Sequence, residues 1–146
     1  MLQASNLTLR IGGRELVRSL ELALAPGECW ALLGRNGAGK TSLILALMGL
    51  RAAHSGSVDL GGRPLASVPR REAARRIGVL LQDEDTDFWG SVTDYVMLGR
   101  HARTRSAWGR DEEGAALASR WLGELDLAGH AAQAYRTLSG GERQRA

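Results

Sequence analysis

The sequence predicts an α/β fold in which a first part that mixes strands and helices is followed by a helical insert. Residues 29–34 and 77–82 are short, continuously apolar runs of the kind that forms fully buried strands. Between them, a glycine-rich loop leads into an apolar stretch, residues 41–50, which predicts a helix that ends near Gly49. From residue 91 onward the pattern is helical, and no repeat or Pro/Gly-rich linker separates the two parts.

The segments around these runs predict further strands and turns. Residues 19–24 alternate apolar and polar side chains, which indicates a half-exposed strand, and "APGE" after them predicts a turn. Residues 57–65 predict a hairpin around Gly61 and Gly62. Residues 70–76 predict a short helix that leads into the second apolar run.

Two helices are predicted in the insert, at residues 91–100 and 111–125. Acidic side chains occupy the first turn of the second helix, where the helix dipole favours negative charge. Its larger apolar residues are predicted to share one face: Leu117, Trp121, Leu122 and Leu125.

The composition is that of an ordinary globular domain, with 44% hydrophobic and 24% charged residues over 146 positions. The net charge of +3 comes mostly from scattered arginines, which does not favour nucleic-acid binding. No apolar stretch approaches the ~18 residues of a membrane span and no signal segment is apparent, so we expect a cytoplasmic chain. The single cysteine, Cys29, excludes an internal disulfide and is expected to be buried within its apolar run.

The strongest motif is "GRNGAGKT", residues 34–41, which fits the pattern G-x-x-x-x-G-K-[ST] between a predicted strand and a predicted helix. Glycines at 34, 37 and 39 let backbone N–H groups point at phosphate oxygens, and the helix start adds the positive end of its dipole. Lys40 would place its charge on the β- and γ-phosphates, while the Thr41 hydroxyl suits Mg²⁺. The motif therefore predicts a bound nucleoside triphosphate with Mg²⁺.

A second anion site is predicted at "LSGGE", residues 138–142. Ser139 and Glu142 have the spacing of a capping box at a helix start. Two consecutive glycines add nothing to such a cap and cost conformational entropy, but they leave N–H groups open to close approach by an anion. One triphosphate does not need two such sites from one copy of the chain, unless the two halves of its binding site come from different subunits.

Together, "GRNGAGKTS", Gln82 at the end of an apolar run, the helical insert and "LSGGERQRA" resemble the nucleotide-binding domain of ABC transporters over the whole chain. The resemblance implies an α/β P-loop NTPase core of the ABC ATPase type with an N-terminal antiparallel β part, ATP and Mg²⁺ as ligands, and ATPase activity. It divides the chain into a β part with the phosphate-loop core (1–82), a Q-loop and helical insert (83–137) and the signature motif (138–146).

The same resemblance assigns roles to single residues. Thr41 and Gln82 would contact Mg²⁺, with Gln82 as the catalytic-site residue, and Ser42 would contact the α-phosphate. Ser139 and Gly141 would contact the γ-phosphate of ATP held by a second ATP-binding subunit in a head-to-tail dimer. The expected nucleotide-binding set, here called the phosphate loop, is Gly34, Arg35, Asn36, Gly37, Ala38, Gly39, Lys40, Thr41 and Ser42. The expected signature set is Leu138, Ser139, Gly140, Gly141 and Glu142.

The Q-loop and insert would dock on transmembrane permease subunits, which implies a place at the inner face of the cell membrane. Residues 96–113, with Leu98, Gly99 and Arg100, resemble importer ATPases for iron-siderophores, haem and cobalamin, and such importers imply a substrate-binding protein that acts indirectly. Another ABC importer or exporter, or a soluble ABC ATPase, is an alternative. So is a P-loop kinase or GTPase, although the sequence shows no guanine-reading motif.

The sequence departs from the family pattern in two ways. Ile11 stands where the family usually stacks an aromatic ring on adenine, which predicts weaker discrimination between bases. The family also continues past "RQRA" with an aspartate that binds Mg²⁺, a catalytic glutamate and a histidine that senses the γ-phosphate. His54, His101 and His130 lie outside such a context and are expected to be surface residues. We therefore expect a partial domain that does not hydrolyse ATP alone, with an inactive remnant as the alternative.

Overall fold

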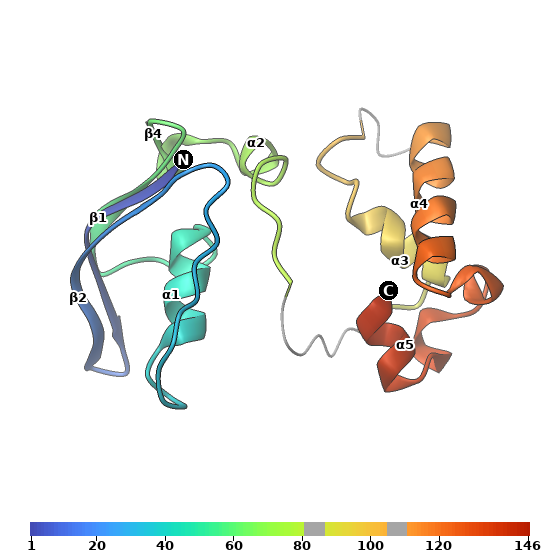
Figure 1. The fold of residues 1–146 in the computed structure, drawn as a ribbon, viewed down its shortest axis with the longest axis horizontal. Helices are drawn as coiled ribbons and strands as arrows, with labels where there is room; N and C mark the ends of the chain where they lie inside the picture. The colour runs from blue at the N-terminus through green and yellow to red at the C-terminus, as the bar shows by residue number, and fades with distance from the viewer. Residues whose placement is uncertain (81–86, 105–110) are drawn as a thin grey trace. The chain divides into compact units, whose positions relative to one another are not determined.

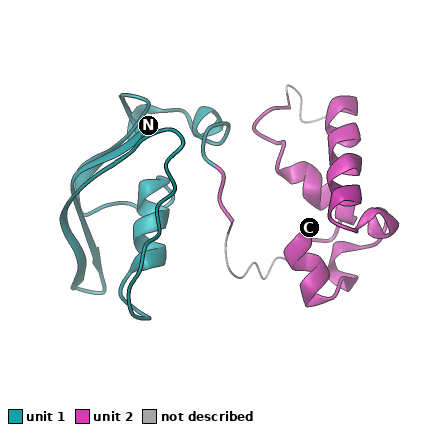
Figure 2. Ribbon diagram, in the orientation of Figure 1, with its two compact units in different colours: residues 1–77 teal, residues 78–146 magenta. Residues whose placement is uncertain are grey.

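The structure is a computed structural model that describes residues 1–80, 87–104 and 111–146. The chain forms two compact units, Met1–Ile77 and Gly78–Ala146 (Figure 2). Residues 138–146 thus belong to the same unit as the helical insert. The three-part division expected from the sequence, with boundaries at 82 and 137, stays a prediction.

The first unit is built on a four-stranded antiparallel sheet (Figure 1). In the order β2-β1-β3-β4, the strands are β2 (Arg14–Leu24), β1 (Leu2–Ile11), β3 (Ser55–Leu60) and β4 (Arg63–Pro64). Strand β1 pairs with β2 along one edge and with β3 along the other, so both of its hydrogen-bonding edges are used. The antiparallel N-terminal β part expected from the sequence is therefore confirmed.

The turns of this sheet follow the glycine positions in the sequence. Gly61 and Gly62, between β3 and β4, have φ angles of 61° and 79°, the left-handed pair that a tight hairpin with right-twisted strands requires. The predicted hairpin is confirmed. The predicted strand at residues 19–24 forms the second half of β2 and alternates between half-buried and exposed side chains. The turn after it is closed by the N–H of Glu28, which donates to the carbonyl of Ala25.

An irregularity in β1 depends on a glycine in β3. The pairing of β1 with β3 shifts register between Ser5 and Thr8, and Asn6 at this point has a φ of 50°. Gly56 lies opposite with a φ of 87°, and a Cβ placed on it would collide with the carbonyl of Asn6. The bulge therefore requires glycine at position 56 for two reasons, its φ angle and the lack of space.

Helix α1 (Lys40–Leu47) covers this sheet and completes its core (Figure 1). Leu43 and Ala46 of the helix are buried in one cluster with three residues of β1: Ala4, Leu7 and Leu9. The predicted end near Gly49 is confirmed, because that residue has a φ of 70° and the helix stops just before it. The apolar stretch is not buried throughout, since Ile44 and Leu50 are exposed.

A smaller cluster closes the first unit beside β3. It contains Leu60 of β3, Leu65 from the 3₁₀ turn η1 (Leu65–Ser67), and Val68. Helix α2 (Arg70–Ala73) follows and confirms the short helix predicted at residues 70–76.

The two predicted buried strands are wrong in the described residues. Neither residues 29–34 nor 77–80 form a strand, and Leu33 and Leu80 are 87% and 96% exposed. Cys29, expected to be buried, is exposed as well. A strand that is apolar on both faces is stable only with paired neighbours and covered faces. Both edges of β1 are already occupied, and no strand in the described part of the chain pairs with either run.

The second unit is helical and confirms the predicted insert. Its elements are α3 (Val92–Leu98), α4 (Glu112–Glu124), α5 (Gly140–Arg145) and the 3₁₀ turns η2 (Ala128–His130) and η3 (Tyr135–Thr137). Its core consists of Val92, Leu122, Leu127, Tyr135 and Leu138. No helix in residues 1–80, 87–104 or 111–146 is long and apolar enough to cross a membrane.

Helix α4 buries a different face from the one predicted. Its buried residues are Gly114, Ala118 and Leu122, spaced four apart. Of the predicted face, only Leu122 is buried, whereas Leu117, Trp121 and Leu125 are exposed. Small side chains on the buried stripe allow the backbone of α4 to lie close to its neighbours. The predicted face is wrong because the large apolar residues Leu117, Trp121 and Leu125, which are exposed, are also spaced four apart.

We expect Gly56→Ala to destabilise the chain far more than Gly62→Ala. Both positions have positive φ and therefore share a strain of about 1–2 kcal/mol for an L-residue. Only Gly56 faces a backbone carbonyl, whereas a Cβ on Gly62 meets nothing within 4 Å. Urea unfolding of both variants measures the difference, and equal losses would contradict the proposed collision.

Candidate phosphate-binding site

The phosphate loop has the backbone conformation that its glycines predict at two of three positions. Gly37 and Gly39 have φ angles of 75° and 95°, in the region that favours glycine. Gly39 also lies against Leu16 of β2, whose Cβ would be 3.0 Å from a Cβ added at Gly39. Gly34 shows neither a positive φ nor a close neighbour, so its steric need for glycine is not apparent.

Lys40 holds the loop closed through its own charge. Its Nζ donates to the carbonyl oxygens of Gly34 at 2.7 Å and Arg35 at 2.9 Å. Lys40 is the only lysine in the chain, so this is its only side-chain ammonium group. An ammonium is a compact charge with three donors that also attracts phosphate oxygens. Two carbonyl groups of the loop are therefore directed at a cation that the chain itself supplies.

The start of α1 is left open to an anion. Its N-cap is Gly39, which offers no side-chain cap, and its first turn contains no acidic residue. Each of the other α-helices described has an acid in its first turn. Unpaired N–H groups and the positive end of the dipole are therefore not neutralised here by the chain itself. Thr41 is exposed and Ser42 half-buried at this helix start.

The expected metal ligands are placed only in part. Thr41 follows Lys40 in the first turn of α1, whereas Gln82 lies outside the described residues. No cluster of three or more His, Cys, Asp or Glu side chains that could hold a metal occurs in the described ranges. The exposed Thr41 hydroxyl fits Mg²⁺ that takes most of its oxygen ligands from phosphate and water, which is how Mg²⁺ usually binds.

The signature segment, residues 138–142, begins helix α5 through a complete capping box. The Oε2 atom of Glu142 accepts from the N–H and from the hydroxyl of Ser139, each at 2.7 Å. The Glu142 N–H donates to the Ser139 hydroxyl oxygen at 3.4 Å. The pKa of Glu142 is lowered, first by the Ser139 hydroxyl and then by its N–H.

The two glycines of this segment have no steric need to be glycine. A Cβ on Gly140 or Gly141 would meet nothing within 4 Å, and neither has a positive φ. Both are exposed, whereas Leu138 anchors the segment in the core. The absence of side chains leaves the first N–H groups of α5 open to solvent, which agrees with close approach by a molecule outside this unit.

The residues of the phosphate loop contact one another within one unit, and those of the signature segment contact one another within the other. The loop closes within the first unit through Lys40, and the signature segment closes within the second through Ser139 and Glu142. Ile11 ends β1, opposite Arg14 of β2. Leu16 of that same strand contacts Gly39, so the hairpin that carries Ile11 belongs to the wall beside the phosphate loop.

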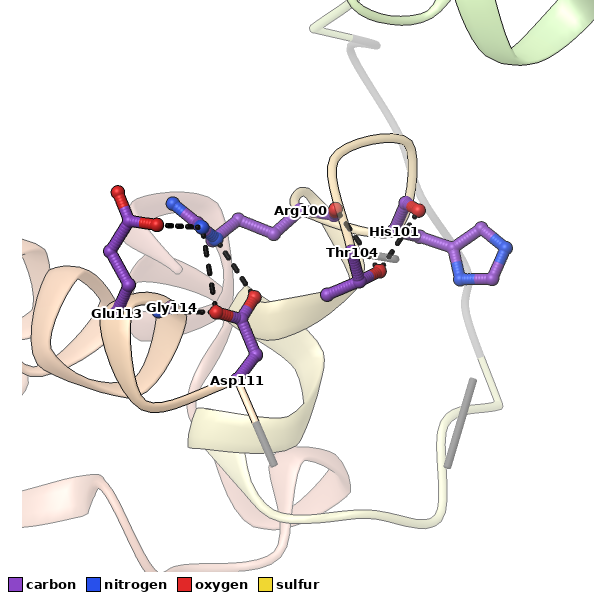
Figure 3. Close-up of polar contacts among 6 residues, drawn as sticks. All are labelled: Arg100, His101, Thr104, Asp111, Glu113 and Gly114. Atoms are coloured by element: carbon purple, nitrogen blue, oxygen red, sulfur yellow. Dashed lines mark hydrogen bonds and ion pairs between the residues drawn. The ribbon is translucent and has the colours of Figure 1, made fainter. Parts of the chain in front are cut away.

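Arg100 joins the two main helices of the insert (Figure 3). Leu98 is the last residue of α3 and Gly99 its C-cap. The guanidinium of Arg100 donates to Asp111 at 3.1 Å and to Glu113 at 3.2 Å. Asp111 also caps α4 by accepting from the N–H of Gly114 at 2.8 Å. The contacts described for Arg100 are thus structural.

Comparison with known proteins decides the family. The model of the ABC transporter family matches residues 17–146, which include both motifs. The chain belongs to the ABC transporter family. The fold and motif resemblance deduced from the sequence is thereby confirmed.

Individual relatives narrow the group of ABC proteins that the chain is similar to. It is 42% identical to the hemin import ATP-binding protein HmuV of Pseudomonas fluorescens and 39% identical to that of Deinococcus radiodurans, over 99% of this chain in each case. These matches cover 55% and 53% of the relatives, so the chain spans about half the length of the curated relatives it matches.

One solved structure supports the fold. A transporter assigned to the metal-chelate ABC type, in an inward-facing conformation, superimposes with a TM-score of 0.73 at 25% identity. The match covers 99% of this chain and 53% of that one.

We expect opposite effects from two glycine substitutions in α4. Gly114→Ala would place a Cβ 2.5 Å from the Asp111 carboxylate and 2.9 Å from Arg100, so it should destabilise the second unit by about 1–3 kcal/mol. Gly123→Ala meets nothing within 4 Å and should stabilise the helix by up to about 1 kcal/mol. Thermal unfolding of both variants measures whether each one gains or loses stability. A stabilising Gly114→Ala would refute the close packing of Gly114 against Asp111 and Arg100.

Acid should loosen the start of α5. Because the folded-state pKa of Glu142 lies below its ordinary value of 4.5, its stabilisation is present above that value and is lost as pH falls through the folded pKa. We expect faster exchange of the Glu142 amide, corrected for intrinsic rates, as the pH falls below that ordinary value. Glu142→Gln should show no such acid step, and a persisting step in that variant would assign the effect to another group.

Proposed function

We propose that this chain is the ATP-binding part of an ABC importer ATPase that takes up a metal chelate of the haem class. The observation that carries the proposal is the start of α1, where a glycine-shaped loop encloses the Lys40 ammonium and no acid neutralises the helix dipole. The names of the relatives and the inward-facing neighbour support the transported substrate class.

In this proposal the triphosphate of ATP replaces the carbonyl partners of Lys40. The ammonium would move from the Gly34 and Arg35 carbonyls to the β- and γ-phosphates, and backbone N–H groups of the loop would donate to phosphate oxygens. Ser42 would contact the α-phosphate, while Thr41 and Gln82 would hold Mg²⁺. When bound, Mg²⁺ would neutralise part of the phosphate charge.

The signature segment would serve a second copy of the ATP-binding subunit. Gly140 and Gly141 leave the α5 start unobstructed, and Ser139 offers a hydroxyl beside it. Ser139 and Gly141 would contact the γ-phosphate held by the partner in a head-to-tail dimer. ATP would then join the two copies, and its hydrolysis would release them.

The remaining assignments follow from the family. We propose docking of the insert on transmembrane permease subunits at the inner face of the cell membrane, with a substrate-binding protein acting indirectly. The exposed Ile11 gives adenine an aliphatic wall in place of an aromatic ring, so discrimination between adenine and guanine would be weak.

Lys40→Ala should weaken Mg-ATP binding at least tenfold, about 1.4 kcal/mol, because the triphosphate loses its main counter-ion. Isothermal titration calorimetry on the full chain measures the change. Arg18→Ala is the matched control, since it removes the same charge from a side chain that is 82% exposed on β2. Equal affinity for wild type and Lys40→Ala would refute the role of the loop.

A chemical readout is available because Lys40 is the only lysine. Mg-ATP should protect its Nζ from acetylation by acetic anhydride, measured by mass spectrometry of the peptide that contains it. The N-terminal amine serves as the internal control. Unchanged acetylation of Lys40 at saturating ATP would count against contact between this side chain and the phosphates.

A further inference from the structure

A chain of polar contacts leads from η3 to the signature segment, entirely within the second unit. The Thr137 hydroxyl donates to the carbonyl of Ala134 at 2.7 Å. The side-chain amide of Gln133 donates to the Thr137 oxygen at 2.7 Å. The Gln133 Oε1 lies 2.7 Å from His130 Nδ1, and His130 Nε2 lies 3.6 Å from Glu142 Oε1.

This series of contacts determines which nitrogen of His130 gains or loses a proton. The Thr137 hydroxyl has one proton, which the Ala134 carbonyl takes, so its oxygen must accept from Gln133. The Gln133 amide then turns its oxygen toward His130, and Nδ1 must carry a proton to donate to it. The proton that the ring gains or loses therefore sits on Nε2, the atom that faces Glu142.

The Glu142 carboxylate contacts two partners, one through each oxygen. Its Oε2 is used by Ser139, whereas Oε1 faces His130. The other charged side chain that acts on Glu142 is Arg145 of the same helix. Arg143 points elsewhere, because its guanidinium donates to backbone carbonyls of residues 136 and 138. From the turns packed against α5, the titratable group that faces this carboxylate is His130.

We propose that His130 is a positioning residue of the signature segment, whose protonated ring fixes Glu142 and through it Ser139. Charged, the ring donates from Nδ1 to Gln133 and pairs through Nε2 with the Glu142 carboxylate. Neutral, it turns a lone pair toward the carboxylate, and the ion pair with Oε1 is lost. The consequence for ATP rests on the function proposed above, but the local coupling does not.

This arrangement predicts a pH window for the capping box. A carboxylate is ionised at lower pH than the one at which an imidazole loses its charge. While the imidazole is charged and the carboxylate ionised, the box should be held from both sides of the carboxylate, and once the imidazole is neutral from the Ser139 side alone. Both side chains are partly exposed, 36% for His130 and 26% for Glu142, so salt should reduce the effect.

The test follows the amide signals of Ser139 and Glu142 by NMR on the full chain between pH 5 and 8. In the wild type both should move in one titration step. His130→Phe should abolish the step, and His130→Lys should hold both signals near their low-pH positions throughout. His54→Phe, in the first unit, should leave the step unchanged.

A step that persists in His130→Phe would overturn the proposal, as would signals in His130→Lys that still titrate. Gln133→Leu offers a second variant, since it removes the acceptor that orients the ring, and it should reduce the step at least about twofold. The two proposals fail separately. Loss of coupling with intact ATP binding would overturn only the role of His130, and intact coupling without ATP binding would overturn only the proposed function.

Discussion

The packing of α1 against β1 is the interaction on which the phosphate loop depends. The loop has few contacts of its own, and it is fixed at its end by Gly39, which both begins α1 and lies against Leu16. Helix α1 is held in turn by Leu43 on the fully buried Leu7 and Leu9. Each buried leucine contributes about 1.5–3 kcal/mol. The geometry of an exposed loop is therefore set by an apolar contact beneath it.

The helix starts of the two units differ in whether an acidic side chain of the chain itself accepts their N–H groups. In the second unit, Asp94, Asp111 and Glu142 each accept N–H groups at the start of a helix, and each has a lowered pKa. Three helices thus satisfy their first turns internally. At α1 the N-cap is a glycine and the first turn contains no acid. The same physical rule that stabilises the second unit explains why an anion would favour the first.

Features set by nearby residues could be predicted from the sequence. The hairpin at Gly61 and Gly62, the end of α1 before Gly49 and the Ser139 capping box all depend on residues within a few positions. The strand predictions are wrong at 29–34 and at 77–80, the described part of the second run, because a buried strand needs neighbours that its own composition does not supply.

The buried face of α4 and the contact between His130 and Glu142 could not be predicted from the sequence, for different reasons. The buried face of α4 is marked by Gly114 and Ala118, whose small size carries little hydrophobic signal. His130 and Glu142 are twelve positions apart and meet across two 3₁₀ turns, so no helical or strand period connects them. The phosphate-loop motif could be recognised in the sequence because phosphate binding requires particular residue types at fixed spacing.

The Arg100–Asp111 ion pair also changes what the segment between its partners can tolerate. Because the ion pair and the cap on α4 hold Arg100 and Asp111 together directly, the entropy cost of closing the chain between them grows only logarithmically with its length, by about 0.6 kcal/mol for each doubling. The pair therefore helps α3 and α4 to keep their geometry whatever the length of the connection between its partners.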